Sequence, residues 1–373
     1  MKKHIRFAIL LCLSGAVLAT GCGKNKEQAE SIAPEQQEVS SEVSEEKIVQ
    51  EPVEEKETHE NQVKSFLTGE WIDQEVAKQR PFACMIGNTK DAQPQYGVGQ
   101  ADVVYEVPVE GSITRLMGIF QDYRNIERIE SIRSCRLYFA YFAKEFDAIY
   151  AHWGQAHYAT NFLKTMDDLD GEDGDLGATF HRDPNRKSPH NGYTTGEGVA
   201  AGIAAKGFEV NHADGYEGHY HFNTDDENQI QLEGADAAVI CPGYKVNRPW
   251  FVYDAESGLY QRFQFGEAHM DGSTNAQVSV KNILVQYTPW HNEDDNGYLY
   301  FETVTNGTGK YITNGKVIDV TWRKDNEDSP TRYYDANNNE ITMNQGKTWV
   351  CVVQDSKAED VQIYATKEEF NGK

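Results

Sequence analysis

The sequence predicts a protein of the α+β class (mixed α/β), with an α/β domain in its first half and a β-rich module in its second half. Two observations lead to this prediction. Between residues 79 and 210, short apolar strand patterns alternate with helical patterns. Between residues 237 and 356, strand patterns follow one another and are separated by polar turns. Residues 211–236 are polar, and we interpret them as the segment that connects the two modules.

The first 21 residues have the pattern of a secretory signal. Three basic side chains lie among residues 1–6, and residues 7–18 form an apolar run. This run is too short to cross a bilayer, which takes about 20 residues. It ends at Leu-Ala-Thr-Gly-Cys, residues 18–22, and small residues directly before a Cys are typical of a lipoprotein processing site. We expect cleavage before Cys22 and lipidation of its thiol; the alternative is an ordinary signal peptide with a chance Cys.

Residues 22–78 are predicted to be the lipidated Cys followed by an acidic tether. Residues 23–65 contain no aromatic side chain and are rich in Glu, Gln and Ser. Such a segment cannot bury enough apolar surface to offset the entropy lost on ordering, so we expect it to be disordered and self-repelling. The character of the chain changes after this segment, because all six Trp and all twenty Tyr lie beyond residue 65.

The α/β domain is predicted to begin with strands and to continue with helices. Residues 102–110 and 113–121 are apolar segments on either side of the turn pair Gly111-Ser112, which predicts a β-hairpin. Residues 134–147 place apolar side chains at helical spacing behind a serine that suits an N-cap. The remaining elements that we predict are strands at residues 81–88 and 148–153 and helices at residues 158–169 and 194–206.

The second module is predicted from seven strand patterns, and residues 357–373 are expected to be a C-terminal tail. The patterns alternate apolar and polar side chains or form short apolar runs, as expected for strands of an antiparallel or partly buried sheet. The predicted strands lie at residues 237–241, 249–254, 259–265, 279–288, 298–304, 316–323 and 348–354.

Composition excludes some classes of partner. The formal net charge of the chain is −24, and a strongly acidic domain repels phosphate backbones, so nucleic acid is not an expected partner. We also expect no cofactor, since no Gly-rich phosphate loop follows a strand pattern. No cysteine pair has the close spacing of a zinc site, so no metal is expected either.

Four cysteines lie beyond the predicted tether: Cys84, Cys135, Cys241 and Cys351. Export permits disulfides, and four cysteines allow three pairings. However, Cys84 and Cys351 lie within apolar runs that are typical of buried strands. The sequence therefore leaves two interpretations open, disulfide bridges or small buried thiols.

A set of short motifs in a fixed order extends from residue 80 to residue 353. The motifs include Gln93-Pro94-Gln95, residues 101–106 (ADVVYE), Ile113-Thr114-Arg115, Ile132-Arg133-Ser134 with Arg136, His152-Trp153-Gly154, Pro189-His190-Asn191, Arg262, His269 with Asp271, and Thr348-Trp349. In these motifs the chain resembles the YerB-like lipoprotein family, a two-part domain of unknown function. The resemblance implies a two-part fold and a place in the cell envelope. Glu130-Ser131 and Gln155-Ala156 depart from the family pattern.

Arg115, Arg133 and Arg136, which lie within these motifs, are the main candidates for ligand binding. The guanidinium group presents a planar fork of donors that suits carboxylates and phosphates. In a strongly acidic chain, several arginines in one cleft would form a local positive pocket, and we expect such a pocket to bind an anion. The alternative is that these arginines form internal ion pairs with carboxylates such as Glu106 and Glu110.

His152, His190 and Asn191 are further candidates for the ligand-binding site. Histidine has an ordinary pKa near 6.5 and is therefore the side chain best suited to acid–base work at neutral pH. Each of these histidines lies close to an expected chain break, at Gly154 and Pro189 respectively. The alternative is that both histidines are hydrogen-bonded parts of the scaffold.

Glu106 and Glu110 are weaker candidates for a catalytic carboxylate pair. On one continuous strand, residues i and i+4 face the same side but lie roughly 13 Å apart, at about 3.3 Å per residue. A glycosidase pair is separated by about 5–9.5 Å. Unless Pro108 bends the strand, the two carboxylates cannot act together, and ion pairs with nearby arginines are the preferred interpretation.

The function that we expect is that of an exported, lipid-anchored binding module for an anionic or peptide ligand of the cell envelope. Its partners would be the lipid bilayer, through the Cys22 anchor, and a cell-wall ligand or an envelope protein. The alternative is a hydrolase or transferase acting on cell-wall material, with Glu106 or Glu110 as acid or base and His152 or His190 as proton shuttle. A spacer without a ligand is the third hypothesis.

Overall fold

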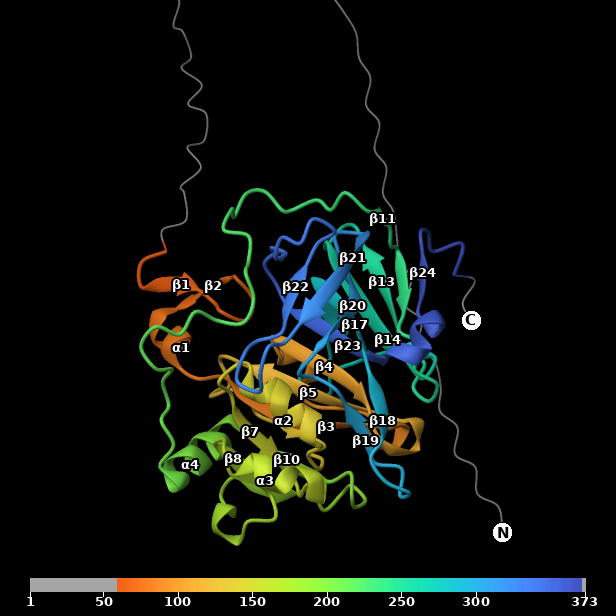
Figure 1. The fold of residues 1–373 in the computed structure, drawn as a ribbon. Helices are drawn as coiled ribbons and strands as arrows, with labels where there is room; N and C mark the ends of the chain where they lie inside the picture. Colours follow the sequence, from red (N-terminus) through yellow and green to blue (C-terminus); the bar gives the residue numbers. More distant parts are fainter. Residues whose placement is uncertain (1–58, 371–373) are drawn as a thin grey trace, which may run out of the picture. The chain divides into compact units, whose positions relative to one another are not determined.

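The computed structural model describes residues 59–370, which fold as one unit (Figure 1). The predicted signal peptide, Cys22 and residues 23–58 lie outside the described residues. Residues 62–78, which the sequence assigned to the tether, form strand β1 (Gln62–Lys64), strand β2 (Trp71–Asp73) and helix α1 (Gln74–Lys78). Leu67, between the two strands, is buried in the core and ties this segment to the folded unit.

One large mixed sheet organises the fold. Its strands follow the order β11-β21-β20-β17-β23-β4-β5-β3-β7-β8, and β22 also pairs with β21. The first half of the chain supplies β3 (Phe82–Asn88), β4 (Val103–Pro108), β5 (Thr114–Phe120), β7 (Ile149–His152) and β8 (Asp168–Asp170). The second half supplies β11 (Ala235–Asp236), β17 (Asn282–Thr288), β20 (Asn306–Thr313), β21 (Lys316–Arg323), β22 (Arg332–Tyr334) and β23 (Thr348–Gln354).

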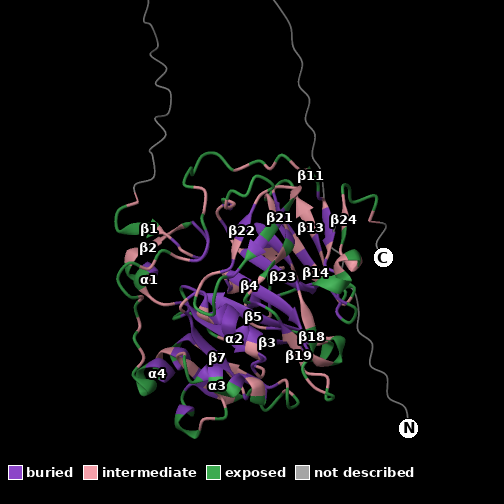
Figure 2. Cartoon of the chain, viewed as in Figure 1, coloured by how far each residue is buried: buried purple, intermediate pink, exposed green. Residues whose placement is uncertain are grey.

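Strand β23 joins the two halves of the sheet. It lies between β17 and β4 and runs parallel to both, so that Val350 has Leu284 on one side and Tyr105 on the other. Every residue of β4 and β23 is buried, as expected of strands that are covered on both faces (Figure 2). The predicted hairpin is present, because β4 and β5 pair antiparallel. The predicted mixed α/β class is confirmed.

Helix α2 (Leu137–Lys144) covers one face of the sheet. Residues 138–143 are all buried, and the ring of Phe142 stacks on that of Tyr105 with centroids 4.6 Å apart. Helix α4 (Gly196–Lys206) begins at Thr195, whose hydroxyl accepts a hydrogen bond from the Gly198 amide. It ends at Gly207, whose φ of 67° is the left-handed conformation that glycine adopts without strain.

The helix predicted at residues 158–169 was wrong in its extent. Only α3 (Thr160–Leu163) is helical there, and it follows a short 3-10 turn at His157–Ala159. The end of the predicted helix is strand β8 instead, which pairs in parallel with β7 so that Leu169 lies beside Ala151. Phe162 and Leu163 are buried on the short helix α3, whereas Leu169 is buried by strand pairing.

A smaller sheet covers the opposite face of the large sheet. Phe251 from the small sheet contacts Trp349 of β23 with ring centroids 5.7 Å apart, and both belong to one buried cluster. Its strands follow the order β15-β14-β13-β12-β24, with β16 paired to β14: β12 (Val239–Cys241), β13 (Trp250–Asp254), β14 (Leu259–Gln264), β15 (Glu267–Ala268), β16 (Ser279–Val280) and β24 (Gln362–Tyr364). Two further small sheets hold β6 (Ile129–Glu130), β10 (Gly192–Thr194) and β9 (Phe180–Arg182), and β18 (Trp290–Asn292) with β19 (Leu299–Phe301).

The structure shows the state of the four cysteines and whether any described helix could span a membrane. Cys84, Cys135 and Cys351 are buried free thiols, and Cys241 is a half-buried free thiol. The structure therefore agrees with the interpretation as small thiols and not with disulfide bridges. None of the helices between residues 59 and 370 is long and apolar enough to cross a membrane.

Candidate functional site

The three candidate arginines come together at the start of helix α2. Arg115 lies at the beginning of β5, and Arg133 and Arg136 belong to the loop that leads into the helix. Arg115 is only 7 % exposed and donates a hydrogen bond to the carbonyl oxygen of Ser134. Arg136 forms a two-pronged ion pair with Glu110, from Nε to Oε1 and from Nη2 to Oε2, at 2.7 Å each. We refer to Arg115, Arg133 and Arg136 as the arginine cluster.

Positive charge exceeds negative charge in this cluster. Burial, followed by the charges of Arg136 and Arg133, lowers the pKa of Arg115 to about 10. Burial and the charge of Arg136 also lower the pKa of Arg133. Glu110 is the carboxylate that pairs with Arg136, whereas Arg115 and Arg133 form no ion pair with any residue between 59 and 370. Two guanidinium groups therefore lie close together without an ion pair of their own in the described chain, although the charge of Glu110 also acts on Arg115.

The backbone adds to the positive potential. Arg136 is the N-cap residue of α2, and no side chain caps the first turn of this helix. The N-terminus of a helix carries a partial positive charge and unsatisfied N–H groups, and both favour an anion. The arginine cluster thus surrounds a helix end that is itself suited to negative charge.

The side chains of Ser131 and Arg133 pack against Gly87 of β3. It is the strand partner of Arg115, and a Cβ atom placed on it would lie 2.8 Å from Ser131 Oγ and 3.0 Å from Arg133 Cγ. Ser131 is fully buried, and its hydroxyl has no hydrogen-bond partner within the described chain. The peptide bond between Glu130 and Ser131 is cis. A buried hydroxyl without a hydrogen-bond partner in the described chain, that of Ser131, therefore lies beside Arg133 of the arginine cluster.

His190 lies on the loop that contacts Arg133. Arg133 donates from Nη1 to the carbonyl oxygen of Pro189 at 2.9 Å. Burial, followed by the charge of Arg133, lowers the pKa of His190, and its buried Nδ1 has no partner among the described residues. Asn191 faces a different group: its amide oxygen accepts from Arg182 at 3.1 Å. The structure therefore brings His190 to the arginine cluster, whereas Asn191 shapes the loop.

His152 lies behind the cluster and supports its backbone. The side chain is fully buried, with Nδ1 3.0 Å from the carbonyl oxygen of Gly154 and Nε2 3.1 Å from Asp168 Oδ2. The turn that His152 contacts is hydrogen-bonded to the loop that carries Arg133 and Arg136, which we call the arginine loop. The Trp153 amide donates to the Arg133 carbonyl oxygen at 3.0 Å. His152 therefore acts on the cluster through the backbone.

Glu106 does not face solvent. It is fully buried at the centre of a polar network between the two sheets, where its Oε2 accepts from Arg262 Nη2 at 2.8 Å and from the Trp349 indole at 3.2 Å. Its Oε1 accepts from Asn247 at 2.7 Å and from Thr114 at 2.9 Å. The carboxylate is used to join the first and second halves of the chain.

The sequence did not predict that Arg262 and His269, from the second half of the chain, belong to this network. Arg262 and His269 are buried, and Arg262 Nη1 lies 2.6 Å from His269 Nδ1. The other ring nitrogen of His269 lies 2.5 Å from the amide oxygen of Gln95. Burial, followed by the charge of Arg262, holds the pKa of His269 well below its ordinary value. The available signal was the presence of Gln95, Arg262 and His269 in the ordered motifs.

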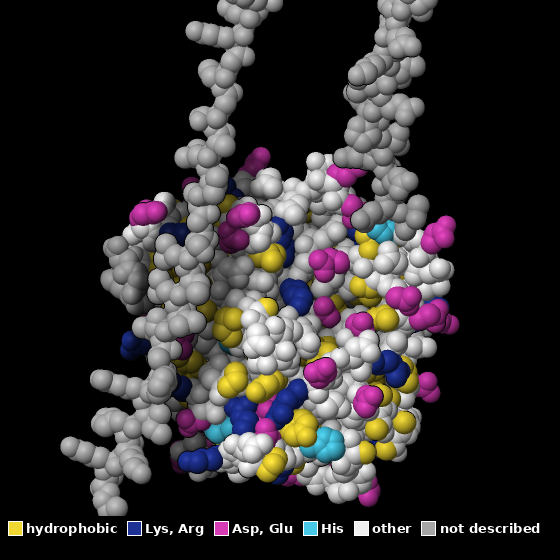
Figure 3. Space-filling model, turned by 180° about the vertical axis from the view of Figure 1, so that it is seen from behind, with side chains coloured by type: hydrophobic (Ala, Val, Ile, Leu, Met, Phe, Trp, Pro, Cys, Tyr) yellow, Lys and Arg dark blue, Asp and Glu magenta, His cyan; other side chains and the backbone are white. Residues whose placement is uncertain are grey.

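The surface around the first-half loops is mixed in charge. In Figure 3, dark-blue Lys and Arg side chains gather in the lower part of the face that is shown, at the height of β7 and β10 in Figure 1. Cyan histidines lie close to them, and magenta carboxylates are scattered over much of the rest of this face. Local positive regions therefore exist on a chain whose formal net charge is −24.

Comparisons with known proteins agree with this two-part arrangement. Residues 67–209 match the model described as "Protein of unknown function (DUF3048) N-terminal domain", and residues 240–350 match the corresponding C-terminal domain. The arginine cluster lies within the first match, and the pair of Glu106 and Arg262 connects the two matches.

A similar protein and a similar solved structure both carry the name YerB and come from Bacillus subtilis. The chain is 28 % identical over 312 residues to a Bacillus subtilis (strain 168) protein whose name reads "Putative lipoprotein YerB", covering 80 % of this chain and 88 % of that protein. The crystal structure of YerB protein from Bacillus subtilis is similar with a TM-score of 0.71 and 27 % identity, covering 81 % of this chain and 99 % of that one.

Proposed function

Because this chain belongs to the DUF3048 family and contains both its N-terminal and its C-terminal domain, we propose that its N-terminal domain binds an anionic ligand of the cell envelope at the arginine cluster. The ligand would present a carboxylate or a phosphate to Arg115 and Arg133 at the start of α2. Planar guanidinium groups bind both kinds of anion with two parallel hydrogen bonds.

The location in the envelope is part of the same proposal. The chain has the signal-like residues 1–21 and a Cys at position 22, and the similar Bacillus subtilis protein is named as a putative lipoprotein. A lipid attached at Cys22 would hold the folded unit at the outer face of a membrane. Its ligand would then be found among the carboxylate- and phosphate-bearing components of the envelope.

One observation carries the proposal: two arginines lie close together at an uncapped helix N-terminus without a carboxylate partner in the described chain. Removing a guanidinium group from water is costly unless a counter-charge and hydrogen bonds replace the lost hydration. Arg115 is 7 % exposed and uses one of its donors on Ser134. A bound anion would supply the missing charge and acceptors, and the unused hydroxyl of Ser131 would add a further donor.

The alternative, a hydrolase or transferase, has less support from the geometry. Glu106 and His152 are fully buried and hydrogen-bonded, and Glu110 is held by Arg136 in a two-pronged pair. A general acid or base must come within hydrogen-bond reach of its substrate, about 2.6–3.2 Å. None of these three carboxyl or imidazole groups is free to do so in this arrangement.

Titration calorimetry on the full chain in non-ionic detergent tests the proposal. The probes are a glycerol phosphate oligomer and a muramyl peptide, which present phosphate and carboxylate groups respectively. We expect at least one probe to bind the parent protein. The substitutions Arg115→Met and Arg133→Gln should each weaken its affinity at least tenfold, since each removes a charged donor that the anion contacts.

The matched control is Arg124→Gln, because Arg124 is exposed and, among the residues that the structure describes, its guanidinium bonds to the side chain of Gln79 alone. This variant should bind like the parent. Thermal unfolding of each variant separates lost binding from lost folding, and the half-buried Arg133 provides the safer variant of the two. Unchanged affinity in both cluster variants, or no binding of either probe to the parent, would contradict the proposal.

A further inference from the structure

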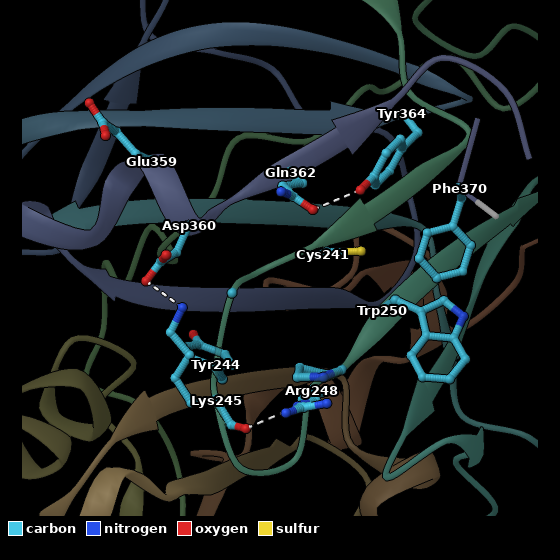
Figure 4. A pocket seen from close by; sticks show the side chains of 12 residues that line it. Cys241, Tyr244, Lys245, Arg248, Trp250, Glu359, Asp360, Gln362, Tyr364 and Phe370 are labelled. Atoms are coloured by element: carbon cyan, nitrogen blue, oxygen red, sulfur yellow. Dashed lines mark hydrogen bonds and ion pairs between the residues drawn. The ribbon is translucent and has the colours of Figure 1, made fainter. Parts of the chain in front are cut away.

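A hollow lies in the C-terminal module, and none of its lining residues belongs to the arginine cluster. It has a volume of about 270 Å³ and opens between the turn that connects β12 to β13 and the segment after β23 (Figure 4). Trp250 and Phe370 form one side of it, and Gln362 and Asp360 lie on another. Lys245 and Arg248, from the β12–β13 turn, lie at its lower edge in the view. The hollow thus combines aromatic and charged walls.

The aromatic wall is held in place from behind. Trp250 and Phe263 are cross-strand partners, and their rings stack at 5.0 Å with an interplanar angle of 7°. Phe370 lies 5.8 Å from the Trp250 ring, and Tyr364 lies 5.6 Å from the Phe370 ring. Trp250 is half-buried, so part of its indole surface remains accessible from the hollow. A fixed aromatic surface with few rotatable bonds costs little entropy when it binds a ligand.

The polar side chains of the hollow are only partly used. Lys245 pairs with Asp360 at 2.9 Å, and the amide oxygen of Gln362 accepts from the Tyr364 hydroxyl at 2.7 Å. Arg248 is exposed and forms no ion pair with any residue that the structure describes. Its Nε makes one long bond of 3.4 Å to the carbonyl oxygen of Lys245. Within residues 59–370, the terminal N–H groups of Arg248 and the amide N–H₂ group of Gln362 have no hydrogen-bond partner, and both residues line the same hollow as the indole.

The hollow continues toward the first half of the chain. A smaller depression of about 50 Å³ shares Gly243, Tyr244, Lys245 and Asp360 with it and extends to Ser112. The two depressions therefore adjoin each other across shared residues, and we refer to them together as the groove. A ligand with more than one unit could contact both of them.

We propose that this groove binds an acidic oligosaccharide, with one sugar ring stacked on Trp250 and its carboxylate or phosphate held by Arg248. A pyranose ring has an apolar face of C–H groups that packs on an indole, while its hydroxyls need donors and acceptors around the rim. Gln362 and the pair of Lys245 and Asp360 supply these groups. Glu359 also lines the hollow, but it lies at the opposite end of the view in Figure 4 from Arg248. The positive charge of Arg248 therefore favours an anionic group at its own end of the groove.

This site is independent of the anion site at the start of α2, and the experiment keeps the two apart. The full chain in non-ionic detergent is titrated with trigalacturonic acid, an acidic trisaccharide, and with chitotriose, a neutral one. We expect the acidic trisaccharide to bind the parent more tightly than the neutral one. Trp250→Ala should weaken binding of the acidic trisaccharide at least tenfold, and Arg248→Gln should remove most of the preference for the acidic form.

Trp71→Ala is the matched control, because Trp71 is a half-buried indole on β2 that stacks on His59 instead of lining the groove. It should bind like the parent. The double variant Arg115→Met/Arg133→Gln should also bind the trisaccharide normally, even if it loses the anion of the other site. If Trp250→Ala unfolds, Arg248→Gln on the exposed turn and Phe370→Ala near the chain end provide the same test. Lack of binding to the parent, or unchanged affinity in the groove variants, overturns the proposal.

Discussion

At the scale of single residues, the buried pair of Glu106 and Arg262 is the most consequential contact of the molecule. Both side chains are fully buried, and they are joined at 2.8 Å between Oε2 and Nη2. Arg262 also lies over the ring of Trp349, 4.3 Å from its centroid. A buried charge that loses its partner keeps its desolvation cost without compensation, which is why breaking such pairs costs about 3–5 kcal/mol.

We therefore expect Glu106→Gln to lower the free energy of unfolding of the full chain by about 3 kcal/mol. The neutral amide leaves Arg262 buried without a counter-charge. Urea unfolding followed by tryptophan fluorescence measures this change. Glu110→Gln is the matched control, since Glu110 lies nearer the surface with 23 % of its side chain exposed, and it should cost only about 1 kcal/mol. Equal losses in the two variants would contradict this account.

The sequence predicted part of this residue-level arrangement. The convergence of Arg115, Arg133 and Arg136 was one of two hypotheses for these residues, the other being internal ion pairs. The pairing of Glu110 with an arginine was the preferred interpretation of that carboxylate. The partner of Glu106 was not predicted. Arg262 lies 156 residues further along the chain, and no local pattern links residues at that separation.

At the scale of secondary-structure elements, Gly87 sets how closely the arginine loop approaches strand β3. The loop side chains of Ser131 and Arg133 pack where a Cβ atom would be, at 2.8 and 3.0 Å. Gly87 does not have a left-handed backbone conformation, so its role is to provide space. The strand and the loop can therefore approach this closely because glycine has no side chain.

Gly87→Ala should displace Ser131 and Arg133, lower the free energy of unfolding by about 1–3 kcal/mol and weaken anion binding at the cluster. Thermal unfolding and titration with the anion found for the parent measure the two effects. Gly174→Ala serves as the control, because a Cβ atom on Gly174 would meet no atom within 4 Å and the residue has no positive φ. An affinity for the anion that is unaltered in Gly87→Ala would show that the position of Arg133 does not matter.

Elements with a strong local pattern were predicted well. The hairpin of β4 and β5 and the helix α2 were expected because turn residues and apolar spacing define them locally. The segment at residues 158–169 was different, because Leu169 is buried by parallel pairing of β8 with β7. Such pairing depends on a neighbour outside the segment, and the apolar side chains alone do not distinguish it from a helix.

At the scale of the whole molecule, the two family domains share one sheet. Strand β23 of the C-terminal part pairs with β4 of the N-terminal part and with β17 of its own part. The sequence predicted an α/β half and a β-rich half. The structure agrees, because helices α1 to α4 lie in the first half and the second half consists mainly of strands. It did not predict the shared sheet, because parallel pairing between residues 103–106 and 348–351 leaves no local signal.

We expect the folded unit to unfold in a single cooperative transition, since neither half can separate without breaking β23 from its neighbours. Differential scanning calorimetry should give equal calorimetric and van't Hoff enthalpies. Pulsed labelling of the thiols provides a second readout: Cys84 on β3 and Cys351 on β23 are both buried and should become reactive together. Two separate transitions, with Cys351 reacting before Cys84, would contradict this expectation.

The central place of β23 also determines when the protein can complete its fold. A ribosome adds about 5–20 residues per second, so roughly 12–48 seconds pass between the synthesis of β4 and that of β23. During this interval the edge of β4, whose residues are all buried in the finished protein, has no partner on that side. Unpaired apolar strand edges invite aggregation. The nascent chain therefore exposes this edge until its last strands emerge.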